Sequence, residues 1–571
     1  MIEMQVDGRT IEAKDGETIL SALKREGIHV PTICYLEGLL PNGACRLCVV
    51  EQEGSGALLP SCSYPATPGL RILTRSPKVF NARKTIVELL LSNHPDDCLY
   101  CVRSRNCELH RLAETMGIRQ RSLRGWKKHR DRDVAGAVIR DLDKCILCGR
   151  CVRICDEIQG VSCIDFVGRG CESYIGTTFS QRLNVSTCVN CGQCIVGCPT
   201  GALTERSCID EVISALADPE KFVVVQHAPA VSVSLAEEFG VPAGQNVDGK
   251  MAAALRRIGF KRVFDTSFTA DLTIMEEAAE LAQRIKNGGV LPMFTSCSPG
   301  WIKFVEQFYP DMIPNLSTCK SPQQMMGAII KSHFAEREKI DPSKIVSVSI
   351  MPCTAKKFER DRPEMGTGHV PDVDYVLTTR ELGRLFKTFG IDLMSFEPQT
   401  ADYPFGERST AGKIFGTSGG VMEAALRTAH FLLTGEEIPR LDILPVRGIT
   451  GIKETRVKIA GVEIGAAVVS GLLNARIMLD DINTGREDLH FIEVMTCPGG
   501  CINGGGQPFG LDPEAAKVRM QTLYKIDETA SLRVSHKNPF IQRLYEDFLG
   551  KPLGEKSHQL LHTHYSARDV L

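Results

Sequence analysis

The cysteines of this chain lie at spacings that suit metal binding. Seventeen of the 23 fall between Cys34 and Cys198, most of them in short, regular clusters, and only five follow Cys208. No basic segment followed by an apolar stretch opens the sequence, so we expect a reducing compartment, where metal ligation accounts for free thiols better than disulfides do. The front half is therefore predicted to carry metal, and the back half to have another task.

Two cysteine runs carry the most specific signal. CILCGRCVRIC (145–155) and CVNCGQCIVGCP (188–199) each contain C-x2-C-x2-C-x3-C, the run of bacterial two-cluster ferredoxins, whose fourth cysteine ligates the other cluster. The ligation is therefore crossed between the runs. One 4Fe-4S cluster is predicted on Cys145, Cys148, Cys151 and Cys198, and a second on Cys155, Cys188, Cys191 and Cys194.

Two further ligand sets precede these runs. The first follows a predicted hairpin and helix and looks like a 2Fe-2S ferredoxin site; its long first interval departs from the plant-type spacing but fits the ferredoxin domains of respiratory complex I. The second, HPDDCLYCVRSRNC, suits another 4Fe-4S cluster. Zinc is the alternative at both, because it also accepts thiolates and imidazole. The two sets are Cys34, Cys45, Cys48 and Cys62, then His94, Cys98, Cys101 and Cys107.

The order of these sets, a 2Fe-2S domain followed by one histidine and three cysteines, resembles the electron-entry subunit of complex I and favours iron and sulfur over zinc. Three iron-sulfur modules in series would form an electron wire. The leftover cysteines are predicted to be small buried hydrophobic residues rather than ligands; they are Cys163, Cys171, Cys208 and Cys319.

The sequence pattern of the remainder of the chain predicts an α/β domain. Apolar β-branched runs such as KFVVVQ and KIVSVSIM alternate with helical periodicity after about residue 209. Open α/β sheets bind ligands beyond the carboxyl ends of their strands. The late cysteines follow such strands, so they could converge on one buried site; they are Cys297, Cys353, Cys497 and Cys501.

These elements predict an α+β multidomain protein. We expect a β-grasp 2Fe-2S ferredoxin-like domain over 1–79, a small helical 4Fe-4S domain with one histidine ligand over 80–125, a two-cluster ferredoxin-like domain over 126–208, and a large α/β domain over 209–571. Lys plus Arg is 67 and Asp plus Glu is 69, so the net charge of −2 gives no case for nucleic acid or anionic lipid. No run of about 18 apolar residues occurs, and we expect a cytoplasmic protein without a membrane partner.

Three late motifs make the chain resemble the FeFe hydrogenases. They are TSCSPGW (295–301), MPCTAKKFE (351–359) and EVMTCPGGCINGGGQP (493–508). FDTSFTADLTIMEEAAEL, NLSTCKSPQQMMG, IFGTSGGVMEAALR and the tail HQLLHTHY, which resembles the family's small-subunit region, extend the match over essentially the whole chain. The large domain would then be the H-cluster domain.

The resemblance implies an H-cluster, a 4Fe-4S cubane bridged by a cysteine to a di-iron unit with CO, cyanide and an amine-containing dithiolate (azadithiolate). Cys353, Cys497 and Cys501 match its ligands, with Cys501 as the bridge, and Lys356 would pair with a cyanide. Core packing is the alternative role for the residues that would shape the di-iron pocket; these are Ala228, Pro229, Gln323, Met351, Phe415 and Met495.

The chain departs from the family at one ligand. The family motif has two adjacent cysteines, a proton relay and then a cubane ligand, where this chain has Cys297 and Ser298. Ser298 could ligate through oxygen, Cys297 could take the ligand position, or the cubane could keep an open iron or be missing. Retention of the cluster is the outcome we favour.

A proton route is also implied by the resemblance. Glu277, Glu280 and Arg284 share one face of a predicted helix, which by itself would indicate a solvated stripe. With the family match they form a relay from the di-iron site to solvent. Its members are Cys297, Glu277, Ser317, Glu280 and Arg284.

The resemblance thus predicts reversible H2 oxidation and proton reduction, with one 2Fe-2S and three 4Fe-4S clusters carrying electrons and with maturation proteins supplying the cofactor. The electron partner would be ferredoxin or an NAD(P)-linked flavoprotein subunit, because no GxGxxG fingerprint follows a strand in this chain. The alternatives are an electron-transfer or sensory subunit with an altered H-cluster, or the hydrogenase subunit of an NAD(P)-linked complex.

Overall fold

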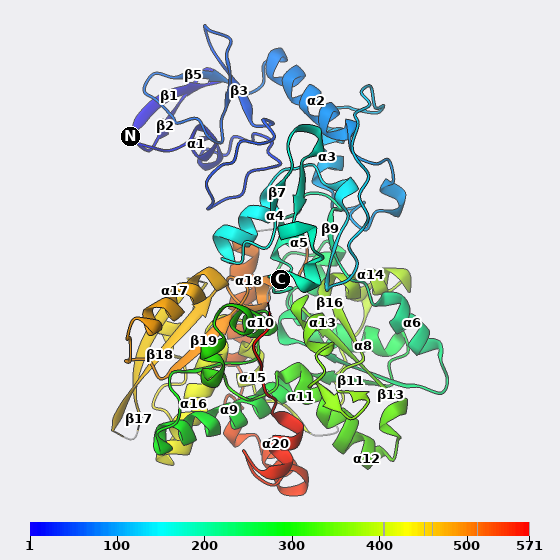
Figure 1. Ribbon diagram of the computed structural model, residues 1–571, viewed down its shortest axis with the longest axis vertical. Coiled ribbons are helices and arrows are strands. Elements are labelled where there is room, and N and C mark those ends of the chain that lie inside the picture. Colours follow the sequence, from blue (N-terminus) through cyan, green and yellow to red (C-terminus); the bar gives the residue numbers. More distant parts are fainter. Residues whose placement is uncertain (404–405, 450, 460, 511, 570–571) are drawn as a thin grey trace. The chain divides into compact units, whose positions relative to one another are not determined.

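The computed structural model describes residues 1–403, 406–449, 451–459, 461–510 and 512–569 (Figure 1). The chain divides into two compact units. The first comprises Met1–Glu157, Ser162–Ser186 and Gly197–Thr204; the second comprises Ile158–Val161, Thr187–Val196 and Glu205–Leu571. Both contain helices and sheets, which agrees with the predicted α+β multidomain class.

The first unit opens with a five-stranded sheet of order β2-β1-β5-β3-β4. Asp7 and Gly8 have φ of 49° and 81°, the left-handed conformation that a tight hairpin turn between β1 and β2 requires. Strand β5 runs parallel to β1, and α1 shares one core with the sheet, so this is the β-grasp arrangement. The bounds are β1 Ile2–Val6, β2 Arg9–Ala13, α1 Ile19–Arg25, β3 Val49–Gln52, β4 Leu58–Pro60 and β5 Arg71–Leu73.

The rest of the first unit has short elements around its cysteines. Helix α2 begins after Ser76, whose side-chain oxygen accepts a hydrogen bond from the Val79 amide at 3.1 Å. The elements are α2 Pro77–Ser92, α3 Glu108–Thr115, β6 Val138–Arg140, α4 Arg150–Arg153, β7 Asp165–Val167 and β8 Tyr174–Gly176; α5 Gln193–Gly197 and β9 Leu203–Glu205 cross the division between the units.

The second unit contains two four-stranded sheets. The first, β11-β10-β13-β16, is entirely parallel. In the second, β12-β19-β18-β17, only β17 is antiparallel to its neighbour. Their bounds are β10 Phe222–His227, β11 Arg262–Asp265, β12 Met293–Phe294, β13 Ile345–Met351, β16 Tyr375–Thr378, β17 Ile452–Ile459, β18 Val462–Ser470 and β19 Phe491–Met495, with a small β14 Gly366–Thr367 and β15 Val370–Pro371 pair apart from them.

Helices surround these sheets, and α9 is buried over most of its length. One side of α9 packs with α15 and α16 through Ala270 and Ile274, and another packs with α11 through Leu272. The helices are α6 Ile209–Ala217, α7 Pro229–Ser232, α8 Asp248–Arg257, α9 Ser267–Asn287, α10 Pro299–Phe308, α11 Pro322–Ile329, α12 Ala335–Glu338, α13 Ala355–Arg360, α14 Thr379–Thr388, α15 Ala411–Ile414, α16 Gly420–Thr434, α17 Leu472–Asn483, α18 Pro513–Glu528, α19 Pro539–Leu544 and α20 Glu555–Leu561.

Burial on two sides gives α9 the apolar surround of a core helix. Its carboxylates at Glu277 and Glu280 are therefore 0% and 7% exposed, and the alternative of a solvated stripe is wrong. Among the described helices, none is both long and apolar enough to cross a bilayer.

Candidate active site

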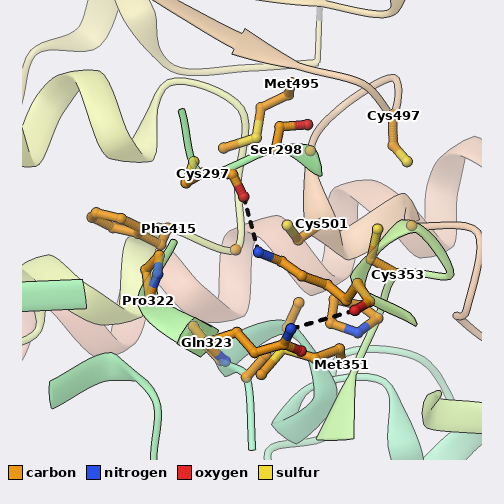
Figure 2. Close-up of a pocket in the computed structure, with 18 of the residues that line it drawn as sticks. Cys297, Ser298, Pro322, Gln323, Met351, Cys353, Phe415, Met495, Cys497 and Cys501 are labelled. Atoms are coloured by element: carbon orange, nitrogen blue, oxygen red, sulfur yellow. Dashed lines mark hydrogen bonds between the residues drawn. The ribbon is translucent and has the colours of Figure 1, made fainter. Parts of the chain in front are cut away.

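A pocket of about 90 Å³ lies where parallel strands of both sheets in the second unit end. Its walls come from the segments that follow β10, β12, β13 and β19, as expected for an α/β site. All four late cysteines line it. Figure 2 shows Cys353, Cys497 and Cys501 on one side and Phe415 with Pro322 on the other. The six residues predicted to shape the pocket all line it too: Ala228, Pro229, Gln323, Met351, Phe415 and Met495.

Glycines let the last motif fold closely around this pocket. Gly500 has φ of 95°, and a Cβ there would lie 2.6 Å from the Ser418 nitrogen. A Cβ on Gly504 would lie 2.2 Å from the Pro352 carbonyl oxygen. Only glycine fits at both positions, because it has no side chain to clash with these neighbours. At Gly500 it also tolerates the positive φ. The spacing of CPGGCINGGG therefore brings Cys497 and Cys501 beside Cys353.

Burial keeps the pocket thiols neutral in the absence of a cation. It raises the pKa of Cys501 to about 12, raises the pKa of Cys353, and raises that of Cys497 well above the ordinary value. Neighbouring thiols raise the pKa values of Cys497 and Cys501 further. Such a set becomes a set of thiolates when a metal centre supplies positive charge. The donor chemistry of the pocket thus fits an iron-sulfur cubane at three positions.

One cation is fixed at the pocket wall. The Lys356 ammonium donates to the Cys297 carbonyl oxygen at 3.1 Å and to Glu359 at 2.9 Å. Glu359 also accepts hydrogen bonds from the side chains of Ser321 at 2.9 Å and Gln323 at 3.0 Å. Glu359 was not identified from the sequence, although its spacing of three residues from Lys356 on a helix is a signal for such a pair.

Ser298 occupies the position where the resemblance expects a fourth ligand, and its hydroxyl has protein partners. The Ser298 Oγ lies 2.8 Å from the Thr496 Oγ1 and accepts a hydrogen bond from the Thr496 amide at 3.2 Å. Ser298 precedes α10, but its side chain does not cap that helix. Thr496 was also missed by sequence reasoning, since nothing in the spacing pairs residues 298 and 496.

The predicted proton-route residues lie on α9 and in the segments that follow β12 and precede α11. The Ser317 hydroxyl donates to Glu280 Oε2 at 2.9 Å, and Arg284 donates to Glu280 Oε1 at 2.6 Å. Burial and the neighbouring Glu280 raise the pKa of Glu277 to about 8, opposed chiefly by the Ser296 amide, which donates a hydrogen bond to Glu277 Oε1 at 3.3 Å, and also by the nearby Ser317 hydroxyl. Glu277 and Cys297 interact electrostatically across the pocket wall. The five residues therefore form a chain of neighbours that begins at Cys297.

The ligand sets of the first unit have different surroundings. Cys34 is hydrogen bonded to Cys45 and Cys62 to Cys48, and the two pairs interact electrostatically, so all four thiols gather. The pKa of Cys45 is lowered to about 6 and that of Cys48 to about 7, in each case chiefly by the partner thiol, and the same hydrogen bonds raise the pKa values of the partners Cys34 and Cys62. Such thiolates suit iron ligation.

The structure brings the predicted ligands of the three 4Fe-4S clusters together to different extents. Burial lowers the pKa of His94 to about 4, and its Nδ1 has no hydrogen-bond partner among the described residues, which suits a neutral imidazole ligand. Cys145, Cys148 and Cys198 interact with one another. The remaining predicted set is divided, with Cys155 in the first unit and Cys188, Cys191 and Cys194 in the second; these ligands stay predictions.

Within the second unit, Cys191, a predicted ligand of one 4Fe-4S cluster, lies near the pocket. Cys191 contributes to the raised pKa of Cys497, and Gln193 hydrogen bonds to Cys497. Gln193 also donates to the Asn503 carbonyl oxygen at 2.9 Å. Of the leftover cysteines, Cys163, Cys208 and Cys319 are buried as predicted, but Cys171 is exposed, because it lies in the turn between β7 and β8.

Comparisons with known proteins cover every part of the chain. Residues 221–505 match the family "Iron only hydrogenase large subunit, C-terminal domain" and 513–568 match "Iron hydrogenase small subunit". Residues 1–77 match a 2Fe-2S iron-sulfur cluster binding domain, 83–122 the NADH-ubiquinone oxidoreductase-G iron-sulfur binding region, and 136–204 the NADH-quinone oxidoreductase subunit 3 ferredoxin-like domain.

Full-length relatives agree with these matches. The chain is 49% identical to the NADP-reducing hydrogenase subunit HndD of Solidesulfovibrio fructosivorans, over 100% of both chains. It is 39% identical to iron hydrogenase 1 of Clostridium pasteurianum, over 98% of this chain and 99% of that protein. A solved structure of a variant of the apo FeFe-hydrogenase HydA1 from Chlamydomonas reinhardtii matches 63% of this chain and 98% of its own at 43% identity, with a TM-score of 0.57.

Proposed function

The chain belongs to the FeFe hydrogenase family, and on that premise we propose that it interconverts H2 with protons and electrons in the cysteine-lined pocket of its second unit. One observation carries the proposal. Cys353, Cys497 and Cys501, which come from two distant motifs, meet at one apolar pocket beside Lys356. A buried cluster of thiols beside the Lys356–Glu359 ion pair has little use in a purely structural core, where burying charged groups is costly even when they are paired.

We assign Cys353, Cys497 and Cys501 as ligands of an H-cluster, with Cys501 as the bridge. When bound, that cofactor supplies a reactive iron and a neighbouring amine base for cleaving or forming H2. The protein supplies the apolar walls that exclude water, including Met351, Phe415 and Met495. Lys356, oriented by Glu359, presents its ammonium to the anionic ligands of the cofactor.

Protons would enter and leave the pocket along the chain of neighbouring side chains that begins at Cys297 and ends at Arg284. Glu277 has a pKa of about 8, so it can both accept and give up a proton near neutral pH. The Ser317 hydroxyl, which interacts with both carboxyl groups, connects Glu277 to Glu280. Arg284 holds the outer oxygen of Glu280 in place. These residues thus act as the relay that the resemblance implies.

Electrons would pass through one 2Fe-2S and three 4Fe-4S clusters held by the ligand sets above. The relative named as an NADP-reducing hydrogenase subunit favours an NAD(P)-linked flavoprotein partner over ferredoxin. No dinucleotide fingerprint occurs in the sequence, so that partner would bind the nicotinamide. Maturation proteins would assemble the di-iron unit.

Hydrogen evolution from a reduced dye, measured together with infrared spectra of bound CO and cyanide, tests the proposal. Anaerobically matured protein should show both turnover and bands. Cys501→Ala is the matched control and should show neither. Absence of bands from fully matured wild-type protein would contradict the proposal.

A second candidate function is an electron-transfer or sensory subunit, favoured by the hydrogen bonding of Ser298 to Thr496. If the serine oxygen stays on Thr496, the cubane has three protein thiolates. Infrared bands without turnover would support this second function.

A further inference from the structure

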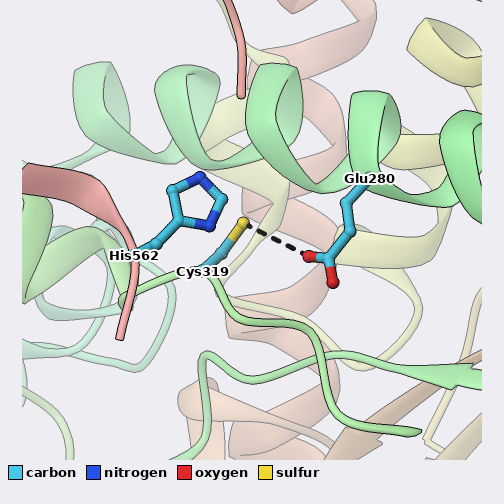
Figure 3. A group of neighbouring side chains, drawn as sticks. All are labelled: Glu280, Cys319 and His562. Carbon is cyan, nitrogen blue, oxygen red and sulfur yellow. Dashed lines mark hydrogen bonds between the residues drawn. The ribbon is translucent and has the colours of Figure 1, made fainter. Parts of the chain in front are cut away.

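A second cluster of metal-ligating side chains shares Glu280 with the proton route. The Glu280 carboxylate, the Cys319 thiol and the His562 imidazole each offer a ligand atom, and these atoms all lie within 4.8 Å of one another. The side chains are 7%, 0% and 8% exposed. Figure 3 shows the three pointing toward one another from α9, from the segment before α11 and from the segment after α20.

Backbone pairing fixes two of the three ligands side by side. Cys319 and His562 face each other in an antiparallel bridge. The Lys320 amide donates to the Leu561 carbonyl oxygen at 2.7 Å, and the Thr563 amide donates to the Thr318 carbonyl oxygen at 2.8 Å. Directly opposed residues of such a pair hold their side chains on the same face. The juxtaposition is therefore set by the fold.

The imidazole is oriented as in a metal site. The His562 Nε2 lies 3.1 Å from Glu276 Oε2, and its Nδ1 lies 2.8 Å from the Thr318 hydroxyl. Glu276 accepts further hydrogen bonds from the side chains of Tyr545 and Ser557 at 2.5 Å each. When Glu276 accepts the Nε2 proton, the Nδ1 lone pair faces the Thr318 hydroxyl, which a metal ion bound at Nδ1 would replace; a carboxylate behind the imidazole in this way is the arrangement that accompanies metal ligation.

Carboxyl groups surround the proposed site. Glu276, Glu277 and Glu280 all lie close enough to the Cys319 thiol to interact with it electrostatically. Arg284 is bound to Glu280 Oε1, whereas Oε2 is the oxygen directed at Cys319, 3.9 Å from its sulfur. A cation can therefore bind Oε2 without displacing the guanidinium.

We propose that Glu280, Cys319 and His562 form a binding site for a divalent zinc-like ion. One sulfur, one nitrogen and one oxygen suit Zn²⁺ or Cd²⁺ better than Mg²⁺ or Ca²⁺, which require oxygen ligands. Ligand atoms of a tetrahedral zinc site lie about 3 to 4 Å apart, given bond lengths of about 2.0 to 2.3 Å. Contraction from the present separations is about 1 Å. On binding, the thiol proton is released to solvent, a metal–sulfur bond forms, and no oxidation or reduction takes place.

Histidines provide a way in from solvent. The His558 ring lies 4.2 Å from that of His562, and both His558 and His564 are exposed. These side chains can capture a cation at the surface before it reaches the buried ligands. Cys319 then has a function beyond the small buried residue that the sequence predicted.

Occupation of this site would close the proton route, a consequence that rests on the proposed function. The metal would take Glu280 Oε2, which now accepts the hydrogen bond of Ser317 at 2.9 Å. The link between Glu277 and Glu280 would be lost. Zn²⁺ is therefore expected to inhibit hydrogen turnover reversibly, and a chelator is expected to restore it.

Zinc absorption spectroscopy of the full-length protein with its iron-sulfur clusters tests the site independently of turnover. After incubation with one equivalent of Zn²⁺ and desalting, we expect one retained zinc with a single sulfur neighbour at about 2.3 Å and lighter neighbours at about 2.0 Å. Iron content should stay unchanged. Cys319→Ala should remove the sulfur neighbour, whereas Cys208→Ala, which removes a buried thiol that contacts Lys357 instead, should keep it.

The possible results are distinct. No retained zinc, or the same sulfur neighbour in wild type and Cys319→Ala, would overturn the site. Should Cys319→Ala fail to fold, His562→Gln provides the second variant, and loss of one light neighbour with weaker zinc retention supports the site. Bound zinc without inhibition would overturn only the closure of the proton route. A protein without turnover that still binds zinc through Cys319 would refute the proposed function while leaving the metal site intact.

Discussion

The thiols of the 2Fe-2S loop and those of the pocket are prepared for iron in different ways. In the first unit, hydrogen bonds between paired thiols lower the pKa values of Cys45 and Cys48 to about 6 and 7 and raise those of Cys34 and Cys62, so two of the four thiols carry negative charge before any metal arrives. In the second unit, burial raises the pKa values of Cys353, Cys497 and Cys501. A loop that offers thiolates can gather iron directly, whereas a buried pocket of neutral thiols needs a preformed cationic centre to displace its protons.

The largest effect is expected from a pocket ligand. Cys501→Ala removes the predicted bridge between the two parts of the cofactor and should reduce hydrogen evolution to background. Infrared bands of CO and cyanide should vanish, while the iron of the first unit stays bound. Metal analysis with infrared spectroscopy checks this, and retained bands would show that Cys501 is not the bridge.

Loss of the carboxyl group of Glu277 is the next largest change. Glu277→Gln should lower turnover by about 10² to 10⁴ fold, the usual contribution of a positioned acid or base, with infrared bands unchanged. Glu277→Asp, which keeps a carboxyl group, should recover part of the rate. Equal losses in the two variants would indicate a packing role and not proton transfer.

The same substitution should change the pH dependence of thermal stability. The pKa of Glu277 rises from 4.5 to about 8 on folding, so between these values the native state holds a proton that the unfolded state has lost. Stability contributed by this group therefore falls as pH rises through that window and is constant above about 8. Glu277→Gln removes this slope, and its Tm relative to wild type should increase from pH 5 to pH 8. A constant difference in Tm would contradict the raised pKa.

A smaller effect is expected at Ser298. Because its hydroxyl is hydrogen bonded to Thr496, Ser298→Ala should keep the infrared bands and change turnover by only about twofold, less than 1 kcal/mol in the barrier. Ser298→Cys adds a fourth thiolate and should raise turnover by about tenfold, or about 1.4 kcal/mol. Loss of the bands in Ser298→Ala would show that the serine oxygen is an iron ligand.

The contrast between the two regions also explains what the sequence could reveal. The ligands of the first unit lie within short runs, and their spacing, together with the hairpin and helix before them, predicts that Cys34 acts with Cys45, Cys48 and Cys62. Pocket ligands from separate motifs needed the family resemblance or the fold. Contacts such as Ser298 with Thr496, or Cys319 with His562, join residues hundreds of positions apart. No local pattern encodes them, because strand pairing and helix packing create them. Burial of Glu277 likewise depends on what packs around α9.

A substitution in the first unit is expected to have the smallest effect on hydrogen evolution at the pocket. Cys45→Ser replaces one of the four gathered thiols with a weaker iron ligand, and the protein should lose about two iron atoms, those of one 2Fe-2S cluster. A small dye can reduce the later clusters directly, so dye-driven hydrogen evolution should stay within about twofold of wild type, under 1 kcal/mol in the barrier. Turnover with the NAD(P)-linked partner should fall much further, because that partner would deliver electrons at the lost cluster. Equal decreases with both donors would place the 2Fe-2S cluster on the only route to the pocket.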